Sequence, residues 1–525
     1  MPSKLVVAVA AIIAIAIGLF GLHSAGEGLR ISRATVGKTP VTVFRPEATA
    51  LAPVVVIAHG FAGSQQLMQP FAETLAQNGY IAVTFDFLGH GRNPVPMRGD
   101  ITEGKSITQQ LLAELGEVAA YARALPGSDG RLAVLGHSMA SDIVVRYAQA
   151  HPEVDATVAV SVFSPVATAD SPRNLLVIVG SLEPSMLRDE GLRIVNLAAD
   201  GKAVPGETYG NFADGTARRL VLARGVEHIG VLYSHDSMVE SLQWMNAAFG
   251  RHQQGFVDSR GRWLALLFAG IIALAWPLSS LLPVASERFC GAGLAWKPLL
   301  IAAVVPALLT PLLLWKLPTD FLPILLGDYL TLHFLVYAIL TGLAYAYVTR
   351  HARAGPGHPR LASMFGARTR MEGTGPAMTT AKSLAIAAIA DAAYNIIAFG
   401  WPIDTYLFSF LPIPPRIPLI AAIACGTLPY FIADEWLTRG EGARRGAYAL
   451  TKFGLLLSLA IAILLNPPKL FFLAIIVPAI LLLFLAFGLI SHWSYRATRH
   501  PLPGAVANAA VFAWAIAVTF PMVIR

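Results

Sequence analysis

The residue best placed to act as a nucleophile is Ser138. It lies in the segment 136–140, GHSMA, which follows a short apolar run at 132–135 and leads directly into an apolar helical stretch. A strand, a tight turn with small residues on both sides of a serine, and then a helix expose the serine Oγ above a sheet. The same arrangement aims the positive end of the helix dipole at that oxygen. The pattern therefore makes Ser138 the candidate nucleophile.

The elements that must position Ser138 are of two alternating kinds. Short β-branched runs lie at 54–58, 81–85, 132–135, 157–162, 175–179 and 220–223, and amphipathic helical stretches lie between them, for example at 65–78, 107–124, 140–150 and 185–198. This alternation predicts an α/β fold whose parallel sheet is covered by helices on both faces. In such sheets the functional groups collect at the carboxyl ends of the strands, so the residues just after each strand are the candidates.

Three segments that follow these strands resemble the α/β-hydrolase family. The segment 136–140 is similar to the nucleophile elbow, G-x-S-x-G, and departs from it at Ala140, which is small enough to let the helix close onto the strand. The segment 59–63, HGFAG, resembles the loop that supplies part of the oxyanion hole. The segment 86–91, DFLGHG, resembles a D-x-x-G-x-G turn of the family, and we assign it no catalytic role. The resemblance covers about 200 residues and implies an α/β-hydrolase sheet.

The resemblance also implies an oxyanion hole. Its donors would be the backbone N–H groups of Phe61 and Met139, with His59, Gly60 and Gly136 in the supporting loops. Acyl transfer places a negative charge on the former carbonyl oxygen, and removal of one such donor typically costs about 100- to 1,000-fold in rate.

The other two members of a catalytic triad follow from the same resemblance, because the family keeps the order serine, acid, histidine. Glu183 follows the run at 175–179, and His228 lies between the last strand and the last helix. The resemblance implies that His228 deprotonates Ser138, that Glu183 orients the imidazole, and that water or another acceptor releases an acyl-enzyme. The fallback residues are His235 for the base and Asp189, Glu190 and Asp214 for the acid. No zinc spacing or dinucleotide motif competes, so neither a metal nor another cofactor is expected.

The composition divides the chain into two halves. Residues 1–262 carry 21 Lys and Arg against 23 Asp and Glu, a net charge of −2, whereas residues 263–525 carry 18 against 9, a net charge of +9. Only 14% of the whole chain is charged and 55% is hydrophobic, against about 25% charged in a soluble domain. The basic excess therefore belongs to the hydrophobic half, and no nucleic-acid partner is expected. Cys290 and Cys425 both lie in that half, so the soluble half has no disulfide framework.

Nine apolar runs are long enough to span a bilayer, which needs about 20 apolar residues per helix. They are 5–22, 263–285, 298–315, 321–348, 383–401, 417–436, 447–465, 470–490 and 504–524. The residues 406–411 are a candidate short re-entrant piece. A cleaved signal peptide is the alternative for the first run, but its apolar stretch is longer than usual and no A-x-A site follows it. The lipid bilayer is thus the expected partner of this half.

The orientation follows from the basic residues, which are retained on the cytoplasmic side. With the N-terminus inside, 14 of the 18 basic residues of the C-terminal half fall in cytoplasmic loops, the longest of which is 349–382. The others, Lys316, Arg416, Lys469 and Arg525, fall on the opposite side. This topology, read as that of a bacterial inner or plasma membrane protein, places the soluble half in the periplasm or cell exterior. The cytoplasmic set is Arg288, Lys297, Arg350, Arg353, Arg360, Arg368, Arg370, Lys382, Arg439, Arg444, Arg445, Lys452, Arg496 and Arg499.

Polar residues inside the apolar runs indicate a possible second function. Ionisable groups are costly in lipid and mark functional sites by default, although interhelical hydrogen bonds and an interfacial position are alternative explanations. A transporter or binding protein with a hydrolase-like recognition domain is therefore an alternative to an enzyme. The candidates are Asp328 with His333, Asp391 with Asn395 four residues later, and Asp434 with Glu435.

These features predict four parts: an N-terminal anchor at 1–22, an α/β-hydrolase domain at 23–250, a linker at 251–262 and a membrane domain of about eight helices at 263–525. The predicted function is that of a membrane-bound serine hydrolase, and an amidase, a peptidase or an acyltransferase could use the same triad. The residues 163–174 are too few for a helical lid, so the site is either open or covered by the membrane domain or by 199–218. We expect an ester substrate with a lipid or amphipathic acyl part.

Overall fold

The computed structural model describes all residues except 1–2, 48–49, 100–104, 353–379 and 525. The chain forms two compact units. The sheet unit comprises Ala14–Leu267, Pro402–Pro415 and Val518–Arg525, and the helical unit comprises Met1–Ile13, Phe268–Trp401 and Arg416–Ala517. Three short pieces of the predicted membrane domain, 263–267, 402–415 and 518–525, group with the sheet unit.

The sheet unit is built on a nine-stranded, mostly parallel sheet with the order β1-β2-β4-β3-β6-β7-β8-β10-β9. The strands β1 and β2 form an antiparallel hairpin at one end, and β9 pairs antiparallel with β10 at the other. A separate parallel pair joins β5 to β11. The strands are β1 Leu29–Val36, β2 Thr39–Pro46, β3 Ala52–Ala58, β4 Ile81–Phe85, β5 Met97–Arg98, β6 Ser128–His137, β7 Val154–Val160, β8 Leu175–Gly180, β9 Thr208–Tyr209, β10 Arg218–Ala223 and β11 Val523–Ile524.

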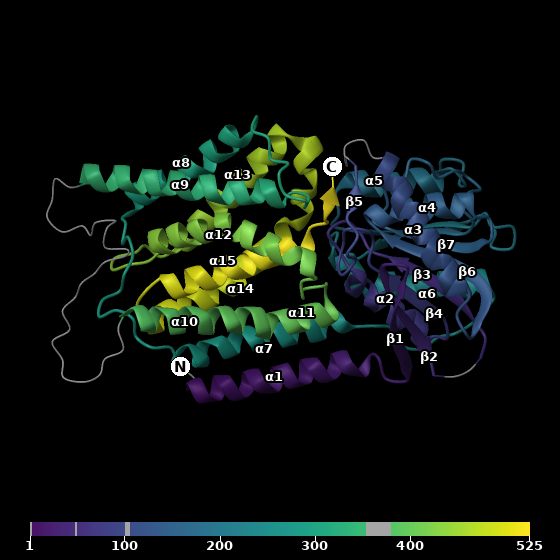
Figure 1. Cartoon of the computed structure of the whole chain (residues 1–525). Coiled ribbons are helices and arrows are strands. Elements are labelled where there is room, and N and C mark those ends of the chain that lie inside the picture. Colours follow the sequence, from purple (N-terminus) through teal and green to yellow (C-terminus); the bar gives the residue numbers. More distant parts are fainter. Residues whose placement is uncertain (1–2, 48–49, 100–104, 353–379, 525) are drawn as a thin grey trace. The chain divides into compact units, whose positions relative to one another are not determined.

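Helices cover both faces of this sheet, as the sequence predicts (Figure 1). Side chains of α2 (Gln69–Gln77) and α6 (His235–Phe249) pack with Val55, Ile57 and Leu135 on one face. Those of α4 (Met139–Ala150) and α5 (Ser185–Asn196) pack with Val177 and Val179 on the other, and α3 (Lys105–Arg123) lies beside α4. Every residue of β3 is buried because neighbouring side chains point into two different cores.

All six predicted strands are present, whereas β1, β2, β5, β9 and β11 were not predicted. Most residues of β1 are not buried, so this strand lacks the continuous apolar run by which the central strands were identified. The strands β5, β9 and β11 have only two residues each and no periodicity that a sequence could show.

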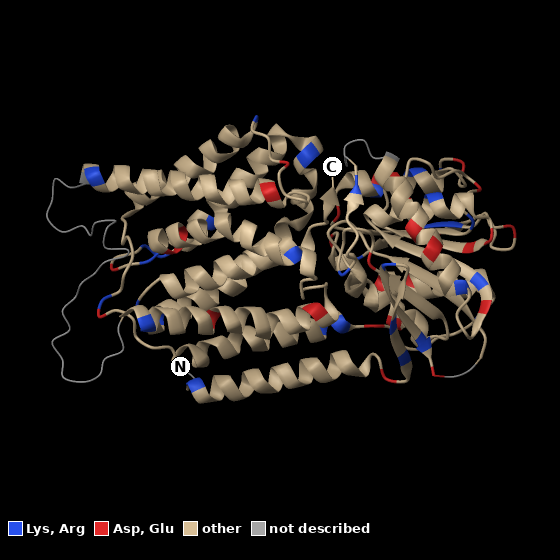
Figure 2. Ribbon diagram, in the orientation of Figure 1, with Lys and Arg blue, Asp and Glu red and all other residues tan. Residues whose placement is uncertain are grey.

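Nine helices of the described residues are long and apolar enough to cross a membrane. Figure 2 shows these helices almost free of charged residues, in contrast to the helices and strands of the sheet unit. They comprise α1 Lys4–Ser24, α7 Arg260–Ser279, α8 Trp296–Leu314, α9 Gly327–Ala352, α10 Thr380–Tyr394, which a π-helical turn at Asn395–Phe399 joins to α11 Gly400–Tyr406, then α12 Ile417–Thr438, α13 Ala447–Leu465, α14 Pro467–Thr498 and α15 Leu502–Thr519.

Small residues allow the helices of the helical unit to approach closely. A Cβ added to Gly426 of α12 would lie 2.2 Å from the Thr331 carbonyl oxygen of α9, and one added to Gly504 of α15 would lie 2.4 Å from the Ser491 hydroxyl of α14. Close backbone approach at small residues is the usual mode of helix association where apolar burial gives no driving force.

One predicted span and the predicted re-entrant piece differ from expectation. The ninth run, 504–524, was predicted as one span, but α15 ends at Thr519 and Val523–Ile524 form β11. The predicted re-entrant piece 406–411 belongs to the sheet unit. The central part of the predicted loop 349–382 lies outside the described residues.

Candidate active site

Ser138 lies at the sharp turn between β6 and α4. Its backbone has φ 54° and ψ −118°, a strained conformation for a residue with a side chain. The Ser138 N–H donates to the Val160 carbonyl oxygen at 2.8 Å, which ties the turn to the end of β7. A Cβ on Gly136 would lie 2.3 Å from the Ala140 carbonyl oxygen, so the first turn of α4 leaves no space for a larger residue at position 136.

Ser138, His228 and Glu183 lie in one hydrogen-bonded row. His228 Nε2 is 2.9 Å from Ser138 Oγ, and His228 Nδ1 is 2.5 Å from Glu183 Oε1. Ser138 follows β6, Glu183 follows β8 and His228 follows β10, so each side chain leaves the carboxyl end of a different parallel strand. The sheet thereby brings together residues that are 45 and 90 positions apart.

The second oxygen of Glu183 is also fixed. Glu183 Oε2 accepts hydrogen bonds from the Gly180 N–H at 2.6 Å and from Ser161 Oγ at 3.1 Å. The Glu183 side chain is fully buried, whereas that of His228 is 16% exposed. Because both oxygens of Glu183 are held by hydrogen bonds, its carboxylate can fix the orientation of the His228 ring.

The fallback residues do not join this row. Glu190 forms an ion pair with Arg193, and the Asp214 carboxylate accepts from Thr216 in its own turn. Asp189 is exposed on α5, and His235 is the exposed first residue of α6. Only Glu183, of the four acids considered, contacts His228 in the part of the chain that the structure describes.

The two residues expected to supply oxyanion donors flank Ser138. Met139 is the first residue of α4, and the first N–H groups of a helix have no intrahelical acceptor. Phe61 follows Gly60, where an added Cβ would lie 2.9 Å from the Ser138 Cβ, so the loop after β3 passes directly against the serine. Ala62 has φ 55°, which turns this loop sharply.

Two buried histidines support these loops. His59 Nδ1 lies 2.8 Å from the Gly60 carbonyl oxygen, and His59 Nε2 accepts from the Phe87 N–H at 3.1 Å. His137 Nε2 lies 3.0 Å from the His228 carbonyl oxygen. Burial lowers the pKa of His59, and burial together with the nearby His228 lowers the pKa of His137 well below its ordinary value. The sequence analysis did not identify His137 as a residue that supports the His228 loop. Its position next to Ser138 could have indicated this role.

The segment 86–91 also has a structural role. Asp86 is buried, and its carboxylate accepts from the Gln65 N–H at 2.8 Å and from the Arg92 N–H at 3.0 Å. A Cβ on Gly91, which has φ 51°, would lie 2.4 Å from that carboxyl group. Asp86 thus joins the loop after β3 to the loop after β4.

Large apolar side chains are exposed at the carboxyl edge of the sheet. Phe163 follows β7, Leu182 follows β8 and Met186 is the second residue of α5, and they are 54%, 67% and 48% exposed. The residues 163–174 form neither helix nor strand, as expected for a site without a helical lid. A cavity of about 440 Å³ in the same unit is lined by Phe44, Gln66, Arg92 and Tyr406 among others, and it does not include the Ser138 row.

The intramembrane candidates lie at separate places in the helical unit. Asp391 of α10 accepts from the Ser494 hydroxyl of α14. Asn395, four residues on, is buried in the π-helical turn, and its Oδ1 has no hydrogen-bond partner among the described residues. Asp328 bonds to the Tyr329 N–H, and His333 Nδ1 lies 3.3 Å from the Tyr329 hydroxyl, so these two candidates share a neighbour.

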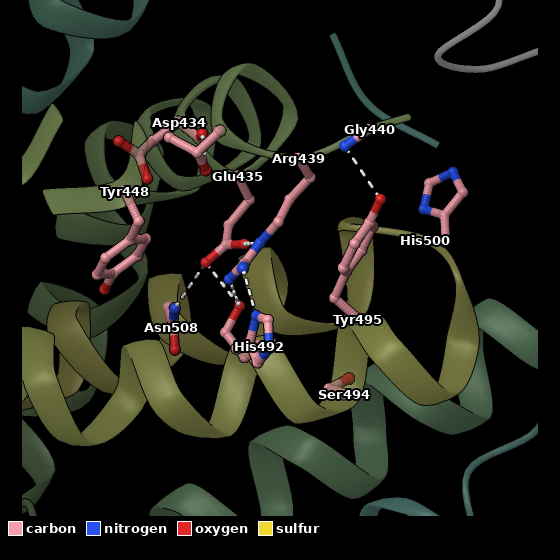
Figure 3. A network of polar contacts seen from close by, with 12 residues as sticks. Asp434, Glu435, Arg439, Gly440, Tyr448, His492, Ser494, Tyr495, His500 and Asn508 are labelled. Carbon is pink, nitrogen blue, oxygen red and sulfur yellow. Dashed lines mark hydrogen bonds and ion pairs between the residues drawn. The ribbon is translucent and has the colours of Figure 1, made fainter. Parts of the chain in front are cut away.

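Asp434 and Glu435 of α12 belong to a larger polar network that also includes residues of α13, α14 and α15. Figure 3 shows part of this network around Glu435 and Arg439. Glu435 forms an ion pair with Arg439 at 2.9 Å and accepts from the Ser491 hydroxyl at 2.6 Å. Asp434 forms an ion pair with Lys452 of α13. Arg439 and Lys452 were counted only as topology signals, but both are buried against these carboxylates.

Comparisons with known proteins match the sheet unit. A sequence model of the family described as serine aminopeptidase, S33, matches residues 49–189, which include Ser138 and Glu183. Among solved structures, a protein of Klebsiella pneumoniae subsp. pneumoniae MGH 78578, described as a candidate dienelactone hydrolase, is 20% identical with a TM-score of 0.33, and the match covers 43% of this chain and 99% of that one. A hypothetical protein of Pseudomonas aeruginosa is 11% identical with a TM-score of 0.31, covering 42% of this chain and 93% of that one.

A search of curated proteins finds no match. The matched family, the mostly parallel sheet and the covering helices agree with one another. The chain therefore contains an α/β-hydrolase domain, followed by a helical region with several long apolar helices.

Proposed function

We propose that this protein is a membrane-bound serine hydrolase that cleaves an ester through Ser138, His228 and Glu183. The observation that carries the proposal is the hydrogen-bonded row of these three side chains at the ends of three parallel strands. Nucleophile, base and orienting acid are recognised by such geometry and by their roles.

The proposed reaction proceeds in two steps. His228 Nε2 takes the proton of Ser138 Oγ as this oxygen attacks the ester carbonyl, and the N–H groups of Phe61 and Met139 stabilise the oxyanion. The imidazolium returns its proton to the leaving alcohol, which leaves an acyl-enzyme. Water, activated by His228, then releases the acid and restores Ser138. Glu183 keeps the proton of the neutral ring on Nδ1, so that Nε2 is free to act as a base.

An ester with a lipid or amphipathic acyl part suits this site best. Phe163, Leu182 and Met186 expose apolar surface along the edge that carries Ser138, and no helix or strand at 163–174 covers it. The nine long apolar helices found among the described residues support a membrane location for the enzyme. The distribution of basic residues supports a cytoplasmic N-terminus and a catalytic domain on the opposite side.

A fluorophosphonate probe tests the proposal directly, because it reacts with activated serines. Full-length protein in membranes should be labelled, and Ser138→Ala should abolish the labelling. Ser32→Ala, in the exposed strand β1, should be labelled like the wild type. The wild type should hydrolyse detergent-dispersed lipid esters in preference to short soluble esters. This hydrolysis should also be lost in Ser138→Ala. Wild-type protein without Ser138-dependent labelling would contradict the enzyme assignment, and turnover of short soluble esters alone would contradict the lipid substrate.

Peptide or amide hydrolysis is the second candidate, because the matched family is described as serine aminopeptidase, S33. The same triad can attack an amide, whose amine leaving group needs the proton from His228. Parallel assays with p-nitrophenyl esters and aminoacyl p-nitroanilides separate the two reactions. Ser138-dependent release from the anilides at rates equal to or above those from the esters would favour the peptidase.

A further inference from the structure

Two segments of the C-terminal half belong to the sheet unit and contact the loops beside Ser138. The first, residues 404–411, consists of the last three residues of α11, which ends at Tyr406, and the five residues after it. The second, residues 520–524, follows α15, which ends at Thr519. We name them the internal segment and the C-terminal segment. Each continues a helix that is long and apolar enough to span a membrane.

The internal segment is hydrogen-bonded to the stretch that follows Phe61. The Ser409 N–H donates to Ser64 Oγ at 2.9 Å, and the Ser409 hydroxyl donates to Gln66 Oε1 at 3.0 Å. Gln66 Nε2 in turn donates to the Asp404 carbonyl oxygen at 3.1 Å. Ser64, Gln66 and Ser409 are all buried, so these hydrogen bonds do not compete with bulk water.

Asp404 holds the internal segment in this position. One carboxylate oxygen accepts from the N–H groups of Phe410 and Leu411, each at 2.9 Å, and so closes the segment on itself. The other oxygen forms an ion pair with Arg92 at 2.5 Å. Arg92 lies in the loop after β4, and its own N–H donates to Asp86, which also binds the loop after β3.

The C-terminal segment contacts the same two loops. The ring of Phe520 lies 6.4 Å from that of Phe61 in an edge-on arrangement. The Met522 N–H donates to the Gly89 carbonyl oxygen at 2.8 Å, and the Met522 carbonyl oxygen accepts from the Met97 N–H at 3.1 Å. The pairing of β11 with β5 continues this contact. Gly89 has φ 73°, and an added Cβ would lie 2.4 Å from the Met522 carbonyl oxygen.

From these contacts we infer that the internal and C-terminal segments position the Phe61 N–H, so that the oxyanion hole is complete only when the C-terminal half is in place. The inference rests on the proposed function, since it assigns these residues a role through Phe61. Asp404 and Gly89 are therefore positioning residues, because neither touches the Ser138 row. The same contacts give the long C-terminal half a role beyond anchoring the enzyme.

The first test is Asp404→Asn in the full-length protein. Asparagine can still accept from Phe410 and Leu411 through its oxygen, but it cannot pair with Arg92. A small displacement of a catalytic group can cost about 100-fold in rate, so we expect kcat to fall about 10- to 100-fold while KM changes less than about 2-fold. The rate of fluorophosphonate labelling at Ser138 should fall by the same factor. The matched control is Asp320→Asn, which removes the ion pair with Lys469 within the helical unit and should leave kcat unchanged.

The second test displaces the C-terminal segment. Gly89→Ala adds a Cβ against Met522, and Gly37→Ala adds one at a similar φ of 59° with no atom within 4 Å. Both glycines have φ in the left-handed region, so the contact with Met522 is the main difference between the two variants. We expect kcat and the labelling rate to fall in Gly89→Ala and to stay near the wild-type value in Gly37→Ala.

The outcomes separate the inference from the proposed function. Wild-type labelling that depends on Ser138, together with unchanged kcat in Asp404→Asn and Gly89→Ala, would overturn the inference and leave the hydrolase intact. Equal loss in Gly89→Ala and Gly37→Ala, or loss of kcat that only parallels loss of folded protein in size-exclusion chromatography, would also overturn it. Absence of labelling in the wild type would instead overturn the proposed function on which the inference rests.

Discussion

Glu183 has one methylene more than an aspartate, and its surroundings fix that longer side chain. Ser161 and the Gly180 N–H hold one oxygen, which leaves the other directed at His228 Nδ1. A Cβ on Gly180 would lie 2.5 Å from the Val226 carbonyl oxygen, so β8 and the segment that carries His228 are in direct contact. The proposal of Glu183 over the fallback acids rests on this local geometry, whereas the sequence indicated Glu183 only by its position after a predicted strand.

We predict that Glu183→Gln lowers kcat by about 1,000- to 10,000-fold with little change in KM. The amide has the same shape, but its NH₂ group or its neutral oxygen would favour the wrong tautomer of His228, and loss of the acid in other triads costs about 10,000-fold. Steady-state kinetics with an ester substrate would measure the loss. Asp189→Asn is the control and should keep full activity, and a comparable loss there would assign the acid differently.

His59 should give the domain a dependence on pH. Burial lowers its pKa, so the folded state favours the neutral ring, which accepts from the Phe87 N–H. A histidine with a lowered pKa contributes stability that is present above the unfolded pKa of about 6.5 and is lost as the pH falls below it. Each unit of lowering corresponds to about 1.4 kcal/mol.

We therefore expect the wild type to lose more thermal stability between pH 7.5 and pH 5 than His59→Gln does. Glutamine can donate and accept in place of the imidazole, and it does not titrate. Differential scanning fluorimetry at the two pH values would measure the change in Tm. His235→Gln, at an exposed position, should keep the wild-type dependence, and an equal dependence in wild type and His59→Gln would show that His59 does not contribute.

At the scale of elements, the tight turn between β6 and α4 explains both small residues that flank Ser138. Gly136 faces the Ala140 carbonyl oxygen, and Ala140 is completely buried beneath the first turn of α4. The departure from G-x-S-x-G at position 140 is therefore compatible with the turn, because an alanine already occupies the available space.

We predict that Gly136→Ala destabilises the domain by about 1–3 kcal/mol, the usual cost of overpacking, and abolishes labelling of Ser138. In contrast, Ala140→Gly restores the family pattern and should cost only about 1 kcal/mol in helix propensity while activity is kept. Chemical denaturation and probe labelling of both variants would measure these effects. Full activity in Gly136→Ala would mean that the turn can widen without moving Ser138.

The sequence predicted the strands in which every residue is buried. It missed short strands such as β11, which pairs with a strand far away in the sequence. The runs at 54–58, 81–85 and 175–179 are buried on both faces, and their apolar character shows it directly. The strand β11 has two residues at the end of an apolar run, and only its pairing with Met97 and Arg98 distinguishes it from a span. Such long-range pairing leaves no periodicity in the sequence.

At the scale of the whole chain, composition distinguished a charged half from an apolar half. It could divide them only at one point along the sequence, whereas later segments of the chain group with the sheet unit. Residues 406–411 of the internal segment were a candidate re-entrant piece by sequence. Its contacts are instead with Ser64, Gln66 and Arg92, more than 300 positions away. The burial of Arg439 and Lys452 was likewise not predicted from the sequence. Each is buried in an ion pair, Arg439 with Glu435 and Lys452 with Asp434.

Those buried pairs affect the predicted topology, because two of the fourteen basic residues assigned to the cytoplasmic side by the sequence form buried ion pairs. Most of the other residues in this set that the structure describes, such as Arg444 and Arg445, are exposed. Their place in the loops still favours the predicted cytoplasmic position. The orientation thus depends on the loops rather than on the total charge of the half.

We predict that a cysteine at position 202 is labelled from outside the cell and one at position 444 only from the cytoplasm. Both side chains are exposed, so access depends on the side of the membrane alone. The variants Lys202→Cys and Arg444→Cys would be made in a background with Cys290→Ser and Cys425→Ala, and treated with a membrane-impermeant maleimide before and after permeabilisation. Labelling of Arg444→Cys in intact cells would reverse the orientation. Reversal would move the proposed site to the cytoplasmic face and change which lipid esters can reach Ser138.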